Sequence, residues 1–363
     1  MTGLLPESRR LVDLTAEAVG GRIVYANDEF FGEASNLLKP HPAVWREGEY
    51  NERGKWMDGW ETRRRRTPGH DFCLIELGAP GTIRETVIET THFRGNQPEA
   101  FALHGLTAPA RSPGELLIRR DDWTELLPET RLEPDATHRF PLPDGPRVTH
   151  VRLSIVPDGG VARLQLRGVV LPDWAALTGS PDQLDVAGLV SGGVVLAVSD
   201  ETFGEPQNLL LPEPSADMGQ GWETRRRRSE GHDWVVIRLG TRSRIVCVRL
   251  ETDHFKGNYP ESASFDWCDL GAAAGAANPA SGGAAPASGG AGPVSGGAGP
   301  ADALPQESDW RPLLARTPLK PHSTHQWISE LEERGAATHI RLNIFPDGGV
   351  ARLRIFGTPD PAV

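Results

Sequence analysis

An internal repeat constrains this chain more than any other feature of its sequence. Residues Trp60–Arg66 spell Trp-Glu-Thr-Arg-Arg-Arg-Arg, and the same letters return at Trp222–Arg228. A Gly-His-Asp triplet follows each run, and a His-Phe-basic-Gly-Asn motif begins at His92 and again at His254. Chance does not produce such a set of matches, so the chain is a tandem duplication of one structural module.

The matches also predict where the modules begin and end. Upstream, Gly20-Gly21 corresponds to Gly192-Gly193, and downstream Pro157–Leu164 corresponds to Pro346–Leu353. The resulting prediction is module one at 11–170, an inter-module linker at 171–182 and module two at 183–358.

The second copy carries an extra segment, residues 271–301. It contains only Gly, Ala, Pro and Ser apart from one Val and one Asn. Such a composition buries too little apolar surface to offset the entropy lost on ordering. We therefore expect a disordered surface insertion.

Short strands are the elements that the sequence favours. Polar and apolar residues alternate, or short apolar runs recur, at 72–77, 148–155, 162–167 and 234–239. With 41 Gly and 31 Pro in 363 residues, long helices are disfavoured. Pro157–Gly160 has the composition of a hairpin turn. The prediction is an all-β fold of two tandem jelly-roll β-sandwich modules.

Charge and composition exclude several classes of function. The net charge of −11 opposes binding to nucleic acid and to anionic membranes. No apolar run approaches the length of a membrane span, and residues 1–20 carry acidic side chains where a signal peptide needs an apolar stretch. We expect a cytoplasmic protein that binds a small molecule, with neither nucleic acid nor membrane as a partner.

The three cysteines, Cys73, Cys247 and Cys268, form no Cys-x-x-Cys pair. This spacing supports neither a disulfide framework nor a zinc site, and it predicts reduced cysteines in or near the cores. No metal-ligand spacing is diagnostic, so no metal site and no cofactor are predicted, although a divalent metal stays open.

The arginine run suits the binding of a small anion. On a strand, Arg63 and Arg65 would point to one face, and Arg64 and Arg66 to the other. Guanidinium groups bind carboxylates in a bidentate manner. The alternative is a solvated charged edge paired with acidic residues.

The repeated histidines and acids admit both functional and structural interpretations. His92 and His254 follow apolar strands and are either acid/base or metal groups, or strand-end histidines bonded to backbone. Asp28 and Asp200 are either acid/base groups or turn-capping carboxylates. The Gly-His-Asp triplets, which include His70, leave the same two alternatives open.

At these motifs the sequence resembles the allantoicase family. The segments that carry the resemblance are Ala26–Phe31, Gly54–Arg66, Gly69–Asp71, His92–Asn96 and His254–Pro260. The resemblance implies jelly rolls similar to the discoidin, or galactose-binding-like, type, assembled as a homo-oligomer. It also implies hydrolysis of allantoate to (S)-ureidoglycolate and urea in purine and allantoin degradation.

A distribution of roles follows from that expected chemistry. Substrate binding is predicted for Trp60, Arg63, Arg65 and Asn96, and in the second copy for Arg225, Arg227 and Asn258. The proton donor is Glu61 or His92, with equivalents Glu223 and His254, and Asp28 or Asp200 activates water.

Two questions stay open at this stage. Either module or both can be active, although the longer segment 39–59 of the first copy favours that copy. The alternative function is a non-enzymatic tandem protein that binds carbohydrate or a small anion, because a fold does not by itself specify an activity.

Overall fold

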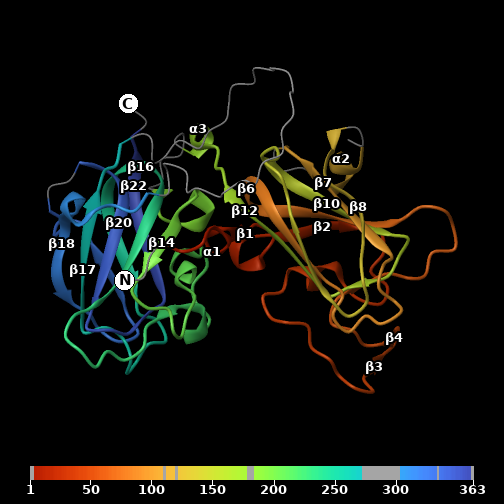
Figure 1. Ribbon diagram of the computed structural model, residues 1–363, viewed down its shortest axis with the longest axis horizontal. Helices are drawn as coiled ribbons and strands as arrows, with labels where there is room; N and C mark the ends of the chain where they lie inside the picture. Colours follow the sequence, from red (N-terminus) through yellow and green to blue (C-terminus); the bar gives the residue numbers. More distant parts are fainter. Residues whose placement is uncertain are drawn as a thin grey trace, which may run out of the picture. The chain divides into compact units, whose positions relative to one another are not determined.

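The computed structural model describes residues 4–108, 112–118, 122–177, 184–271, 303–332 and 335–360. The predicted insertion at 271–301 lies outside the described residues, except for Gly271. The chain forms two compact units (Figure 1). We call Leu11–Asp173 module 1, and Trp174–Val363 together with Met1–Arg10 module 2.

Module 1 is built almost entirely of strands. Its main strands are β1 (Val12–Asp13), β2 (Arg22–Ala26), β6 (Asp71–Glu89), β7 (Ala100–Leu106), β8 (Thr124–Arg131), β9 (Thr137–Pro141), β10 (Val148–Val156) and β12 (Arg163–Val170). Shorter elements are the pair β5 (Trp60–Glu61) and β11 (Gly160–Val161), the hairpin β3 (Tyr50–Asn51) and β4 (Gly54–Lys55), the helix α2 (Pro113–Ile118), and the 3-10 turns η1 (Glu17–Val19) and η2 (Ala34–Leu38).

Module 2 repeats this order. Its strands are β13 (Leu184–Asp185), β14 (Val194–Val198), β15 (Trp222–Glu223), β16 (Asp233–Glu251), β17 (Ser262–Cys268), β18 (Arg311–Pro318), β19 (Thr324–Trp327), β20 (Ala336–Phe345), β21 (Gly349–Val350) and β22 (Arg352–Pro359). Its helices are α1 (Glu7–Arg10) and α3 (Trp174–Leu177), with 3-10 turns η4 (Leu189–Ser191), η5 (Pro206–Leu210), η6 (Met218–Gln220) and η9 (Glu307–Asp309).

In each module, one long strand takes part in both sheets of the sandwich. The first part of β6 pairs with β2 and β10, and its second part pairs with β9 and β12. In module 2, β16 pairs in the same way with β14 and β20, then with β19 and β22. All these pairings are antiparallel, and the prediction of two tandem jelly-roll β-sandwiches is confirmed.

The length of β6 differs from the prediction. Alternation indicated a strand over 72–77 only, because Gly78-Ala-Pro-Gly81 has the composition of a break. In the structure the strand continues through these residues to Glu89. A Cβ atom at Gly78 would lie 2.5 Å from the Val19 carbonyl oxygen, so the missing side chain allows close backbone approach. Tertiary packing therefore overrides the local signal.

The space between the sheets is filled by apolar side chains. Trp60 and Trp222 are fully buried, each at the start of its repeated Trp-Glu pair. Cys73, Cys247 and Cys268 are free and buried, as predicted. Among the described residues, none of the helices has the length and apolar character that a bilayer crossing requires.

Residues at the start of the chain belong to module 2, which the repeat did not predict. The Leu5 N–H donates to the Leu196 carbonyl oxygen at 2.7 Å, and Leu4 packs on the cluster around Leu196 and Val236. Arg9 forms ion pairs with Glu201 and Glu205 at 2.5 and 2.6 Å.

Candidate active site

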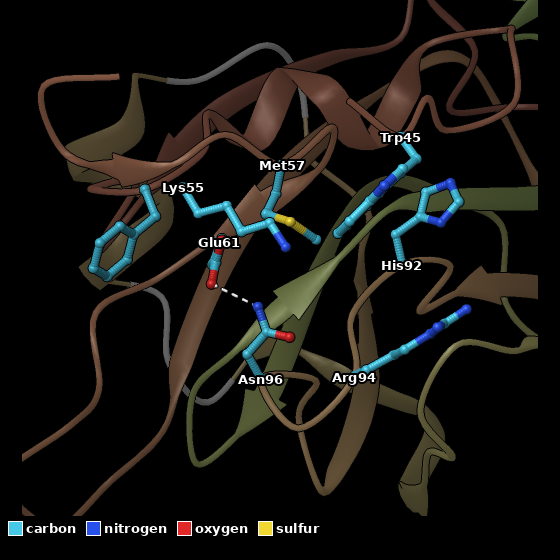
Figure 2. A pocket seen from close by; sticks show the side chains of 8 residues that line it. Trp45, Lys55, Met57, Glu61, His92, Arg94 and Asn96 are labelled. Carbon is cyan, nitrogen blue, oxygen red and sulfur yellow. Dashed lines mark hydrogen bonds between the residues drawn. The ribbon is translucent and has the colours of Figure 1, made fainter. Parts of the chain in front are cut away.

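A pocket of about 400 Å³ opens in module 1 beside the repeated Trp-Glu pair (Figure 2). It contains three of the residues predicted as functional, Glu61, His92 and Asn96. The other lining residues are Phe31, Trp45, Lys55, Met57 and Arg94. The pocket thus combines a carboxyl, an imidazole, an amide and two cations with an apolar wall.

The Pro-Asp-Gly-Gly turn positions Asn96. The Gly160 N–H donates to the Asn96 carbonyl oxygen at 2.7 Å. A Cβ at Gly159 would lie 2.7 Å from that same oxygen, and one at Gly160 would lie 2.0 Å from the ring of buried Phe93. The repeated glycines therefore allow the close approach that brings the Asn96 loop to the pocket.

Glu61 and Asn96 form the polar centre of the pocket. The strand pair β5 and β11 fixes Glu61 opposite Gly160, and the Asn96 amide Nδ2 donates to Glu61 Oε1 at 2.9 Å. Burial raises the pKa of Glu61 above its ordinary value, while the Asn96 hydrogen bond and the Lys55 charge act in the opposite direction. Burial is the larger effect, which suits a carboxyl that exchanges protons with a substrate.

His92 is held from two sides. Its backbone adopts φ of 70°, a left-handed conformation, and its N–H donates to Asp135 Oδ1 at 2.8 Å. Its ring Nε2 lies 3.2 Å from the Ala43 carbonyl oxygen. A carbonyl oxygen only accepts hydrogen bonds, so Nε2 carries the proton and Nδ1 is the acceptor of the neutral ring.

Two cations reach the pocket from different segments. The Lys55 ammonium lies 4.0 Å from the centroid of the Trp45 ring, a cation–π contact. Arg94 donates through Nε to Asp135 Oδ2 at 2.9 Å, and its Nη2 lies 2.6 Å from the same oxygen. Both cations suit an anionic ligand.

The arginine run is not the strand that the sequence analysis assumed. Strand β5 ends at Glu61, so the four arginines lie outside the strand that the sequence analysis assumed for them. Arg63 pairs with Asp28 at 2.7 Å, and Arg65 pairs with Asp71 at 2.5 Å. Neither Arg63 nor Arg65 is among the residues that line the pocket.

Asp28 and Trp60 also have partners away from the pocket. Asp28 Oδ1 accepts from the N–H groups of Phe30 and Arg63. Burial alone would raise the pKa of Asp28, but these hydrogen bonds and the Arg63 charge outweigh it and lower the pKa. The Trp60 indole donates to the Asp28 carbonyl oxygen at 2.8 Å from a fully buried position.

Module 2 keeps the same frame around its own pair. Asn258 donates to Glu223 at 2.6 Å, and His254, at φ of 69°, lies with Nε2 2.8 Å from the Ser215 carbonyl oxygen. Remaining equivalents also keep their partners: Arg225 pairs with Asp200 at 3.0 Å, Arg227 with Asp233, and the Trp222 indole with the Asp200 carbonyl.

Sequence reasoning missed Trp45, Lys55, Met57, Phe31 and Arg94 as pocket residues. The available signal was the extra length of segment 39–59, which supplies Trp45, Lys55 and Met57 and has no full counterpart in the second copy. Among the described residues, no group of three or more His, Cys, Asp or Glu side chains could hold a metal ion.

Comparison with known proteins identifies the family. The model of the allantoicase repeat matches residues 12–171 and 184–360. A probable allantoicase of Pseudomonas aeruginosa strain UCBPP-PA14 is 43% identical over 351 residues, covering 97% of each chain.

Solved structures agree with this match. The crystal structure of allantoicase from Saccharomyces cerevisiae superposes with a TM-score of 0.72 and 30% identity, covering 96% of this chain and 93% of that one. A second allantoicase structure gives a TM-score of 0.73 at 29% identity, with coverage of 98% and 95%. The chain therefore belongs to the allantoicase family.

Proposed function

We propose that this chain is an allantoicase whose module 1 pocket hydrolyses allantoate to (S)-ureidoglycolate and urea. Family membership supports the activity. The observation that supports the location is the Glu61 carboxyl, which has a raised pKa, is held by Asn96 and shares the pocket with two cations. The activity serves allantoin degradation in purine metabolism.

The chemistry of allantoate matches the groups in the pocket. The substrate is a small anion in which one carbon bears a carboxylate and two ureido groups. Lys55 and Arg94 offer positive charge to the carboxylate. The Asn96 side-chain oxygen and His92 Nδ1 are acceptors for ureido N–H groups.

Proton transfer is assigned to Glu61 and His92. The bond between the central carbon and one ureido nitrogen breaks, and this nitrogen keeps the electron pair and takes a proton from the Glu61 carboxyl. A water oxygen bonds to the central carbon, and the water proton passes to His92 Nδ1. Solvent then returns the proton from His92 to Glu61, which restores both groups. In Figure 2, Glu61 and His92 lie on opposite sides of the pocket, as a donor and an acceptor must.

This proposal differs from the roles first predicted for Asp28, Arg63 and Arg65. Those three side chains pair with each other or with Asp71. A carboxylate whose pKa is lowered is a weaker base, which disfavours Asp28 for water activation. In our proposal these ion pairs stabilise the loop that follows β5, and the pairs of Arg225 and Arg227 stabilise the loop that follows β15 in module 2.

We propose further that the enzyme needs no metal or other cofactor and acts in the cytoplasm as a homo-oligomer. Urea release that survives exhaustive chelation supports the first part, and loss of activity that added divalent metal restores contradicts it. Sedimentation of the purified protein tests the assembly.

The deciding experiment is urea release from allantoate by the purified chain. We expect turnover by the wild-type protein and loss of roughly 10²-fold or more in Glu61→Gln. A wild-type protein that binds allantoate without releasing urea would favour the non-enzymatic binding function instead.

A further inference from the structure

The buried carboxylate of Asp58 and the imidazole of His92 contact the same peptide group. Asp58 Oδ2 accepts from the Val44 N–H at 2.9 Å. The Ala43 carbonyl oxygen, in the same peptide unit as that N–H, lies 3.2 Å from His92 Nε2. One peptide group therefore connects a carboxylate at its N–H end with an imidazole at its carbonyl end.

The carboxylate is charged and fixed in place. Asp58 is 6% exposed, and Arg163 donates through Nη2 to Asp58 Oδ2 at 2.7 Å. Arg163 also donates to the carbonyl oxygens of His41 and Asp58. Burial opposes ionisation, but the Arg163 and Val44 hydrogen bonds outweigh it and lower the pKa of Asp58. Asp58 is therefore ionised at neutral pH.

Module 2 has the same arrangement without the charge. Gln220 occupies the position of Asp58, and its Oε1 accepts from the Ala216 N–H at 2.8 Å. The Ser215 carbonyl of that peptide lies 2.8 Å from His254 Nε2. Arg352 repeats the contacts of Arg163 with backbone carbonyls of residues 220 and 351. The side chain that accepts from this peptide N–H is thus a charged carboxylate in module 1 and a neutral amide in module 2.

We propose that Asp58 is a positioning residue that acts on His92 through the peptide group between Ala43 and Val44. Hydrogen bonds in a chain polarise one another, so a negative charge at the N–H end makes the carbonyl oxygen a stronger acceptor. A stronger acceptor favours the imidazole tautomer that carries its proton on Nε2. His92 Nδ1 is then the hydrogen-bond acceptor of the ring, which is the state that the proposed mechanism requires. The expected effect of Asp58 on turnover therefore rests on the proposed function.

The two modules provide isosteric and reciprocal variants. Asp58→Asn removes the charge in module 1 while keeping an oxygen for the Val44 N–H, and Gln220→Glu adds a charge in module 2. Labelling the full chain with ring-¹⁵N histidine reports the tautomer of each imidazole, and His92→Gln and His254→Gln assign the signals. This readout does not depend on turnover of allantoate.

We expect Asp58→Asn to move the His92 ring signals from the Nε2–H tautomer toward a mixture. It should lower kcat roughly tenfold, as loss of an orienting partner does in other sites, and change KM by less than about twofold. Gln220→Glu should shift the His254 Nε2 signal in the direction of a stronger hydrogen bond to the Ser215 carbonyl oxygen and leave the kinetics unchanged.

Unchanged His92 signals in folded Asp58→Asn overturn the inference. If that variant does not fold, Gln220→Glu decides, because unchanged His254 signals then overturn it. A wild-type protein without allantoate turnover contradicts the proposed function, while the ring signals still test the effect of Asp58.

Discussion

Modules 1 and 2 hold an identical Glu–Asn pair in the same β frame but surround it differently. Glu61 with Asn96 and Glu223 with Asn258 each pair across a hydrogen bond beside a left-handed histidine. Both pairs depend on a Pro-Asp-Gly-Gly turn whose second Gly packs on a buried Phe ring. Duplication therefore preserved the contacts that the backbone geometry requires.

The surroundings of the pair distinguish the copies. Segment 39–59 supplies Trp45 and Lys55 to the wall of the pocket that holds the pair in module 1. In module 2 the corresponding segment is shorter, and Met218 Sδ lies 3.8 Å from Asn258 Nδ2. In module 1, the Lys55 ammonium and the Trp45 ring line the pocket. In module 2, the Met218 thioether contacts the Asn258 amide instead.

A second difference surrounds the histidines. In module 1, Asp135 accepts from the His92 N–H and pairs with Arg94. In module 2, His322 accepts from the His254 N–H, and Lys256 replaces Arg94. The backbone contact of the histidine is kept in both modules, while its acceptor changes from a carboxylate in module 1 to an imidazole in module 2.

The largest expected effect separates the two acids. Glu61→Gln should reduce urea release by about 10²- to 10⁴-fold, because it removes the proton donor. The matched variant Glu223→Gln should change it by less than about twofold, since independent sites act separately. Comparable losses in both variants would mean that both modules are catalytic.

The next effect concerns the cations. Lys55→Met should raise KM for allantoate roughly tenfold, the value of one charged hydrogen bond, with a smaller change in kcat. Arg63→Ala removes a cation paired with Asp28 and should alter KM by less than about threefold. If steady-state kinetics show a larger rise in KM for Arg63→Ala than for Lys55→Met, the carboxylate of allantoate binds at the arginine run instead.

The pH dependence should respond to the amide partner of the acid. Because protonated Glu61 is the active form, kcat/KM should fall as pH rises through its raised pKa. Asn96 donates to the ionised carboxylate, so Asn96→Ala should raise this pKa further and move the falling limb to higher pH. Asn258→Ala serves as the control and should leave the pH–rate profile in place.

The smallest effect concerns stability of module 2. In module 1, Glu29 accepts a hydrogen bond from the Ala34 N–H. Glu201 and Pro206 occupy the corresponding positions in module 2. Because proline has no N–H, Glu201 lacks this hydrogen bond and forms an ion pair with Arg9 instead. Arg9→Ala should lower the free energy of unfolding by about 0.5–1 kcal/mol, as for other partly exposed pairs. Arg46→Ala, which breaks an exposed pair with Glu49, is the control in urea denaturation. Equal losses in the two variants would show that Arg9 has no special role.

Much of the fold was readable from local patterns, and less of the site. Period-two alternation located the strand around Val148–Ile155, which the structure extends by one residue to Val156. The same pattern missed the continuation of β6 through Gly78 and Gly81. Carbonyl oxygens of segments distant in sequence lie so close to these two glycines that a side chain would not fit, and alternation along the chain does not report such contacts. Glu61, His92 and Asn96 were found because the repeat marks them.

The sequence by itself determined the duplication, the all-β class and the family, since these follow from periodicity and from motifs that persist in both copies. Only the tertiary structure decided which polar groups meet. Arg63 and Arg65 follow Glu61 closely in the chain yet bind Asp28 and Asp71. Lys55 on β4 and Asn96 in the loop after β6 are distant in sequence from each other, yet both act on Glu61. The physical reason is that partners of a charged side chain are set by distances across the fold, which neighbouring letters in a sequence do not encode.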